Sequence, residues 1–169
     1  MVRTLILMIL TCGMVSCSTP TASKKETAPD TGADQPFFDQ NTVSLLSLNS
    51  DAEKALEDWT AMKNLLSNLE TLPNVKQNSL AFQLKTLSEE VLEIKTNKLS
   101  EPFNQPSIIS RFKVIKTFVL KAHLTDASLH SSAQFKENIT ELLNAYNAFV
   151  NQLNVVVKET INTDTIIDF

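Results

Sequence analysis

The stretch "FKENITELLNAYNAFVNQLNVVV" (135–157) decides the fold class of this chain. Its apolar residues recur at alternating spacings of four and three, which is the pattern of one buried helix face. They are Phe135, Ile139, Leu142, Tyr146, Phe149, Leu153 and Val156. We therefore predict a helix over 132–158, with Ser131 and Gln134 as a capping box at its start.

Three segments upstream show the same helical periodicity and predict helices over 51–71, 75–98 and 107–125. Ser50 and Glu53 are spaced as a capping box for the first of them, and Asn74 is placed to cap the second. Prolines separate the segments, and each connection is short. Short connections favour antiparallel neighbours, so the expected fold is all-α, an up-down-up-down four-helix bundle.

Glycine supports the helical prediction, because the chain has only two, Gly13 and Gly32, and both precede the first periodic segment. Tight hairpins and bulges in sheets depend on glycine, so its absence from the body favours helices. A second arrangement stays open. The long seams would also suit two helical hairpins completed by a second copy of the chain, which makes a homodimer possible.

The first residues differ from this body in composition. One positive charge, Arg3, precedes the uncharged run "TLILMILTCGMVS" (4–16), whose apolar core has the length of a signal-peptide core and is too short to span a membrane. Residues 17–36 are rich in Ser, Thr, Pro, Ala and charge, which predicts a flexible tether. The expected organisation is a leader over 1–16, a tether over 17–36 and a helical domain over 37–169.

The segment "MVSC" (14–17) resembles the lipobox of bacterial lipoproteins. Val15 and Ser16 fit that motif, whereas Met14 replaces the usual Leu. The resemblance implies cleavage before Cys17, lipid on its sulfur and acylation of its new amino group, because stable anchoring needs more than one acyl chain. Ser18, in place of Asp, implies an outer-membrane destination, facing the periplasm.

Cys12 is the competing lipidation position, since "ILTC" (9–12) also ends in cysteine. Its apolar core would be very short, and Thr11 would occupy the position that prefers the smallest residues. A plain secretory peptide is the remaining alternative. If cleavage occurs at Cys17, the remainder has no second thiol and cannot form an internal disulfide.

Metal, cofactor and catalytic patterns are weak in this sequence. A structural zinc site needs about four ligands, whereas the body offers two histidines, His123 and His130. No Glu-x-x-His pair of the di-iron bundles occurs. The expectation is a non-enzymatic protein without metal or cofactor. A small-ligand or haem-binding bundle is the alternative, with Met62 and His123 as conceivable axial ligands.

Charge gives the first candidate binding surface. The net charge is −4, which argues against nucleic acid as a partner. From Pro102 to Thr125, however, no acidic residue occurs, and four cations fall on the third predicted helix: Arg111, Lys113, Lys116 and Lys121. Either the acidic first helix compensates them within the bundle, or they form a patch for an anionic partner.

Asparagines give the second candidate surface. The run 142–157 carries no charge, and asparagines recur at helical spacing on the side away from the seam, as Asn144, Asn147, Asn151 and Asn154. A helix face that is polar but uncharged costs less to desolvate than a charged face. Such a face is therefore suited to contact with a partner or with a second copy of the chain. A solvated asparagine face is the alternative. The single tryptophan, Trp59, and the single tyrosine, Tyr146, are expected to be core aromatics or to lie at a ligand cleft.

Two longer runs, "LSEPFNQPSIISRFKVIKTFVLKAHL" and "ITELLNAYNAFVNQLN", resemble small uncharacterised lipoproteins of Bacteroidota, over residues 59–155. This resemblance implies a location and no mechanism. The resulting functional prediction is a lipid-anchored protein of the cell envelope. Its helical bundle would bind an envelope protein partner or support envelope assembly.

Overall fold

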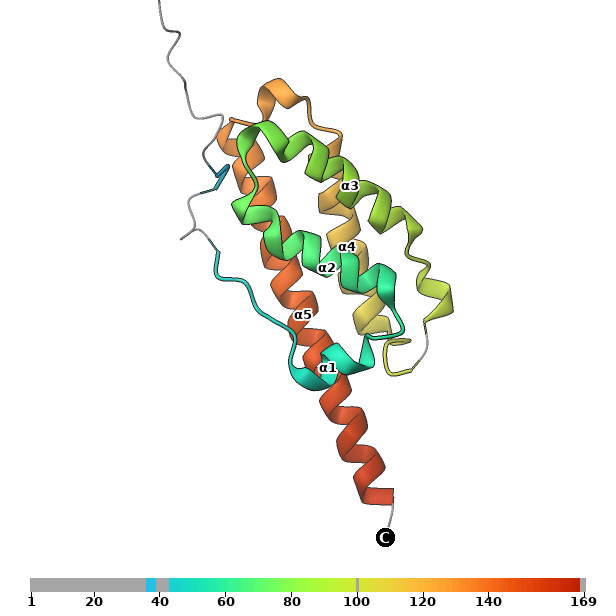
Figure 1. Cartoon of the computed structure of the whole chain (residues 1–169). Coiled ribbons are helices and arrows are strands. Elements are labelled where there is room, and N and C mark those ends of the chain that lie inside the picture. The colour runs from blue at the N-terminus through green and yellow to red at the C-terminus, as the bar shows by residue number, and fades with distance from the viewer. Residues whose placement is uncertain (1–35, 39–42, 100, 168–169) are drawn as a thin grey trace, which may run out of the picture. The chain divides into compact units, whose positions relative to one another are not determined.

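The structure is a computed structural model that describes residues 36–38, 43–99 and 101–167, with the side chains of 98 and 161–167 excepted. These residues belong to the second of the two units into which the chain divides, 31–169. The described residues form five α-helices: α1 (Ser50–Ala55), α2 (Thr60–Thr71), α3 (Leu80–Glu93), α4 (Pro106–His123) and α5 (Ala133–Ile167) (Figure 1). The described residues contain no β-strand, and the predicted all-α class is confirmed.

Consecutive helices pack against one another, α2 on α3, α3 on α4 and α4 on α5. The circuit is completed by α1 and α2, which both contact α5, so that α2 and α4 occupy diagonal positions (Figure 1). These contacts are compatible with the expected up-down-up-down arrangement.

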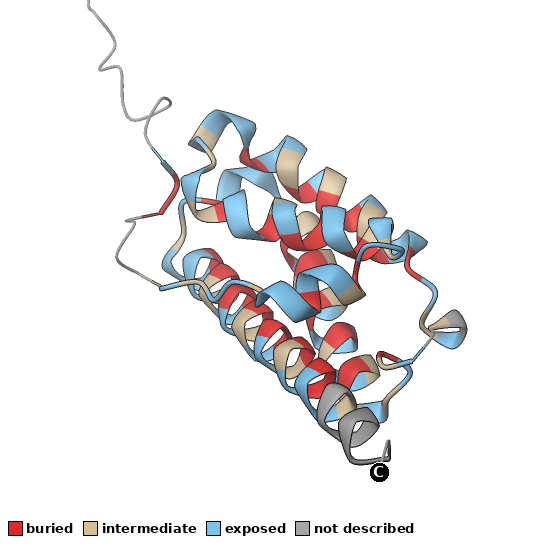
Figure 2. Cartoon of the chain, turned by 60° about the horizontal axis from the view of Figure 1, so that its bottom comes forward, coloured by how far each residue is buried: buried red, intermediate tan, exposed pale blue. Residues whose placement is uncertain are grey.

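The core lies on the faces that the helices turn toward one another, shown in red in Figure 2. Every residue of the 135–156 seam is buried, with none more than 2% exposed. The predicted apolar stripe of 107–125 is buried as well, at Ile108, Phe112, Ile115, Val119 and Ala122. The helical periodicity therefore identified the buried faces of α4 and α5.

The prediction of one helix over 51–71 is wrong, because the helix breaks between α1 and α2. Asp58, Trp59 and Thr60 are weak helix formers, which makes this the least costly place to interrupt the segment. The break separates two packing directions, since α1 lies on α5 whereas α2 also packs on α3. The cap is Asn49 and not Ser50, with Asn49 Oδ1 accepting from Ala52 N at 2.8 Å.

The predicted helix over 75–98 is also too long, and α3 occupies only Leu80–Glu93. Val75 is extended because its carbonyl accepts a hydrogen bond from Phe37 N at 2.9 Å, and an isolated bridge joins Pro36 to Lys76. Asn74 therefore caps no α-helix. Helical preference at 75–79 yields to this tertiary pairing and leaves only a short 3-10 turn.

The last two helices follow the prediction more closely. The fourth helix, α4, matches the predicted 107–125 to within two residues at either end. The fifth helix begins near the predicted position but continues to Ile167, because neither Pro nor Gly interrupts 133–167. Ser132 supplies its first-turn hydrogen bond in place of Ser131, with the Oγ accepting from Phe135 N at 3.1 Å.

Two non-helical segments lie on this framework. We call 36–38 the entry segment, in which Phe37 and Phe38 are both buried. We call 43–49 the strap, an extended run that leads into α1. The predicted leader and tether, including Cys12 and Cys17, lie outside the described residues. Among the helices that are described, none is long and apolar enough to cross a membrane.

Candidate functional site

The four predicted cations lie along α4, at different degrees of exposure. Lys113 and Lys121 are exposed, whereas Arg111 and Lys116 are half-buried. Lys121 Nζ donates to Asn138 Oδ1 on α5 at 2.8 Å, and Arg111 Nη1 donates to the Ser107 carbonyl at 3.4 Å. Within the described part of the chain, no ion pair joins any of the four to a carboxylate.

The exposed cations share one stripe of α4 with apolar side chains. We call this the α4 stripe, and its exposed members are Ser110, Lys113, Val114, Thr117, Lys121 and Leu124. Val114 is 46% exposed, and Leu124, at the end of the helix, is 79% exposed. Since α2 is diagonal to α4, the acidic first segment is poorly placed to neutralise the stripe. The stripe therefore presents positive charge together with apolar surface.

Two of the four predicted asparagines are bound within the chain itself. Asn147 Oδ1 accepts from Leu46 N at 2.8 Å, and its Nδ2 donates to the Ser44 carbonyl at 2.8 Å. Asn154 repeats the arrangement one step along, accepting from Asn49 N at 2.9 Å and donating to the Ser47 carbonyl at 3.2 Å. Each amide thus pairs with the strap as a neighbouring β-strand would.

The spacing of these two asparagines matches the spacing of their partners. Seven helical residues rise about 10.5 Å, and three residues of extended chain span about 10 Å. Asn147 and Asn154 are seven apart, whereas the strap residues they engage are displaced by three. Asn144 and Asn151 are exposed on the same helix and are available for other contacts.

Tyr146 lies at a cleft of about 560 Å³ between the strap, α1 and α2. Its side chain is only 2% exposed, and burial, followed by the nearby charge of Glu70, raises the pKa of Tyr146 to about 12. Charged side chains of both signs line the cleft, among them Glu53, Lys54 and Lys63. Tyr146 is thus both a core aromatic and part of a cleft wall.

Trp59 lies at a second cleft, of about 400 Å³, beside the break between α1 and α2. The ring of Trp59 is 5.7 Å from that of Phe103, at an angle of 41°. Phe103 is buried, whereas Trp59 is partly exposed. Asp58, Glu93 and Glu101 stand on the same cleft. No periodicity pointed to Phe103, because it lies in the connection between α3 and α4.

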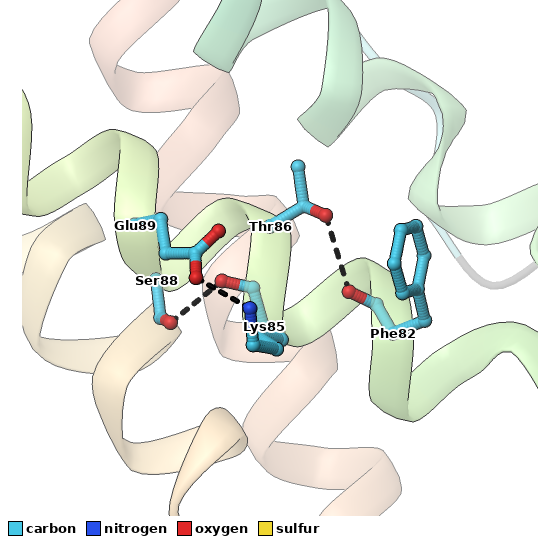
Figure 3. Close-up of polar contacts among 5 residues, drawn as sticks. All are labelled: Phe82, Lys85, Thr86, Ser88 and Glu89. Atoms are coloured by element: carbon cyan, nitrogen blue, oxygen red, sulfur yellow. Dashed lines mark hydrogen bonds and ion pairs between the residues drawn. The ribbon is translucent and has the colours of Figure 1, made fainter.

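Local polar contacts link successive turns of α3 (Figure 3). Lys85 pairs with Glu89, and Thr86 Oγ1 and Ser88 Oγ donate to the carbonyls of Phe82 and Lys85. The ring of Phe82 is 71% exposed. The Lys85–Glu89 pair is typical of a solvated helix face. Ser88, in contrast, is only 4% exposed, and its hydroxyl is satisfied by the Lys85 carbonyl.

A partly buried carboxylate between α2 and α3 is a feature that the sequence did not indicate. Asn68 Nδ2 donates to Glu90 Oε1 at 2.6 Å, while Glu90 Oε2 is buried without a hydrogen-bond partner. Burial raises the pKa of Glu90, and the hydrogen bond from Asn68 only partly opposes this effect. In the sequence, Glu90 clusters with Glu89 and Glu93, which is typical of a charged, solvated helix face. No sequence pattern therefore predicted that Glu90 is partly buried.

Neither histidine belongs to a metal-binding cluster among the described residues, where no three His, Cys, Asp or Glu side chains come together. His130 is 4% exposed, stacks on Phe135 at 4.4 Å, and its Nε2 lies 3.2 Å from the Thr125 carbonyl. Met62 is fully buried near the start of α2, whereas His123 ends α4. Since the diagonal helices α2 and α4 run the same way, these two lie toward opposite ends and are poorly placed as a haem-ligand pair (Figure 1).

Comparison with protein-family models, with curated proteins and with solved structures found no match for this chain. The functional argument therefore rests on the surfaces and clefts themselves.

Proposed function

We propose that this chain is a lipid-anchored, non-catalytic binding module of the bacterial cell envelope. In this proposal Cys17 is the acylated first residue, and the tether links it to a helical domain with four-helix-bundle topology. That domain engages an envelope protein through the α4 stripe. The proposed location is the outer membrane, facing the periplasm, as the lipobox resemblance implies.

One observation carries the binding part of this proposal. Lys113 and Lys121 are exposed on a stripe without acidic residues, and no carboxylate among the described residues pairs with either. Exposed charges of one sign steer an oppositely charged partner toward the surface. Val114 and Leu124 then provide apolar area that such a partner would cover.

The chemistry of the stripe favours a protein with an acidic face. Lysine is a flexible point charge that pairs readily with carboxylates. The hydrogen bond from Lys121 to Asn138 holds that side chain over the groove between α4 and α5. A second copy of the chain is the other partner considered. Its contact would involve Asn144 and Asn151, which the strap leaves exposed.

The test uses the full, lipidated chain purified from envelope membranes of a bacterial host with its bound proteins. The variant K113Q/K121Q removes two charges from the α4 stripe, and K54Q/K85Q removes two charges elsewhere as a matched control. We expect a stoichiometric acidic partner with the wild type and with the control. Recovery with K113Q/K121Q should fall at least tenfold and should fall with added salt in every case. Equal recovery with all three chains would contradict the proposed surface.

Anchoring is tested separately by mass spectrometry of the mature N-terminus. We expect a chain that begins at Cys17 and carries both the thioether-linked lipid and the N-acyl group. The variant C17S should leave the membrane fraction, whereas C12S should remain in it. An unmodified Cys17, or a mature chain that begins elsewhere, would contradict the anchor without affecting the α4 stripe.

A further inference from the structure

The Trp59 cleft has aromatic walls on a firm support. Phe103 and Ile94 are 3% and 5% exposed, so their positions are fixed by the core. Trp59 packs on Phe103 and remains partly exposed at the cleft. A cleft of about 400 Å³ lies within the usual range for small-molecule sites.

The local backbone at Trp59 departs from the usual preference at a helix start. Trp59 occupies the N-cap of α2 with φ −108° and ψ 62°, and its side chain makes no capping hydrogen bond. Ser, Thr, Asp or Asn normally fills this position and satisfies one of the first free N–H groups. Departures from local preference concentrate at functional sites, where a side chain is selected for another purpose. Trp59 instead packs partly on the core and leaves the rest of its ring at the cleft.

The charge around the cleft is negative. Asp58, Glu93 and Glu101 contribute three carboxylates to the lining, against one cation, Lys95. Lys95 Nζ donates to the Leu92 carbonyl at 3.4 Å at the end of α3, which holds it against the backbone. A ligand in the cleft therefore meets the exposed part of the Trp59 ring and an excess of carboxylates.

We infer that the Trp59 cleft binds a small organic cation, an ammonium group that carries apolar substituents. The exposed part of the Trp59 ring attracts such a cation through its quadrupole, and the carboxylates add long-range attraction. Phe103 is buried and supports the Trp59 ring. A bare metal ion fits less well, because among the described residues no three His, Cys, Asp or Glu side chains converge to hold one, and an anion would be repelled. This inference uses no residue of the α4 stripe, so it does not depend on the proposed protein partner.

Trp59 is the only tryptophan in the chain, so its fluorescence reports on this cleft alone. The full chain in detergent is titrated with choline, and in parallel with its neutral carbon isostere, in which carbon replaces the ammonium nitrogen. We expect a saturable change in Trp59 emission with choline and at least tenfold weaker binding of the isostere. Equal responses to the two probes, or no saturation with choline, would overturn the inference.

Two variants locate the binding. E101Q removes one carboxylate at an exposed position and is expected to weaken choline binding about threefold to tenfold. F103L removes the buried ring on which Trp59 packs and is expected to weaken choline binding about threefold to tenfold, because Trp59 loses its support. E53Q, which changes a carboxylate in the other cleft, is the matched control and should bind as the wild type does. Circular dichroism shows whether F103L folds. If it does not, the choline affinities of E101Q and E53Q still test the site, and equal affinities would overturn it.

Discussion

The entry segment and the strap both lie on α5, yet apolar burial and hydrogen bonding contribute in different proportions to the two attachments. In the entry segment, the Phe37 ring contacts Phe38 at 4.8 Å and Phe135 of α5 at 5.6 Å, both edge to face. The strap is held by the four hydrogen bonds of Asn147 and Asn154, and its residues Val43, Leu45 and Leu48 pack, partly buried, against the core. The entry segment thus combines two buried rings with a backbone hydrogen bond from Phe37 N to the Val75 carbonyl. The strap combines half-buried apolar side chains with four hydrogen bonds near the surface.

This difference separates strength from register. Apolar burial is the larger contribution to stability, but it tolerates sliding, because the hydrophobic effect has no direction. Hydrogen bonds near the surface contribute less, but their geometry fixes which strap residue faces which turn of α5. The entry segment should therefore determine how firmly the N-terminal chain is held, and the strap should determine where α1 begins.

The largest expected effect comes from Phe37→Ala. Truncating a buried phenylalanine typically costs about 3–5 kcal/mol, and we expect about 3 kcal/mol here because the segment is short and free to relax. Urea unfolding followed by circular dichroism measures the loss. The matched control is Phe82→Ala, whose ring is 71% exposed, with an expected change below about 0.5 kcal/mol. Equal losses for the two variants would contradict the buried contact.

Removing both strap amides is the second test. The double variant N147A/N154A should lose about 2 kcal/mol, since it deletes four hydrogen bonds near the surface at about 0.5 kcal/mol each. Hydrogen exchange at the Leu46 and Asn49 amides should accelerate, because both donate to these side chains. N144A/N151A is the matched control. Exchange at Leu46 and Asn49 that is unchanged in N147A/N154A would exclude the pairing.

Tyr146 reports whether the strap covers its cleft. It is the only tyrosine, so tyrosinate absorbance follows it alone, and we expect a midpoint near pH 12. Because the folded pKa is raised above the unfolded value, the stabilisation from neutral Tyr146 is complete below about pH 10. It is lost as the pH rises from about 10 toward 12.

Two variants make this pH test specific. Y146F should show no such alkaline loss of stability, because it has no phenol to ionise. Releasing the strap in N147A/N154A should lower the pKa of Tyr146, since Ser47 and Leu48 form one wall of its cleft. A midpoint near pH 10 in the wild-type protein would show that Tyr146 is solvated.

The smallest expected effect concerns the cation over the entry segment. Lys136 Nζ lies 5.8 Å from the centre of the Phe37 ring, and K136Q should cost about 0.5 kcal/mol. In the F37A background the same change should have no effect, because the ring is gone. A double-mutant cycle by urea unfolding measures the coupling. A coupling energy of zero between Lys136 and Phe37 would show that the cation–π contact does not stabilise the entry segment.

The seam of 135–156 was predictable because helical burial repeats within one segment. The start of α3 was not, because it depends on residues far upstream. Phe37 N binds the Val75 carbonyl, and this long-range contact overrides a local helix signal. The break at Trp59 is similar, since no Gly or Pro marks it and its cause is the change of packing partner between α1 and α2.

The candidate site was predictable only in part. The asparagine row pointed to a polar contact surface, and for Asn147 and Asn154 the contact is the chain's own strap. The seven-residue spacing of Asn147 and Asn154 matches the spacing of residues in an extended segment, and this match could have predicted their pairing with the strap. For the α4 stripe, composition alone located the cations, but their lack of carboxylate neighbours required the diagonal placement of α2 and α4. Phe103 lay in a connection, where periodicity carries no information.

The order of the two attachments has a mechanical consequence. Tension applied to the chain upstream of Pro36 reaches the buried rings of Phe37 and Phe38 before it reaches the strap. The stronger attachment therefore bears the load, and the hydrogen bonds of Asn147 and Asn154 stay unstressed until the rings have been pulled out. Domain orientation and cleft shape would then persist under forces that the amides alone would not withstand.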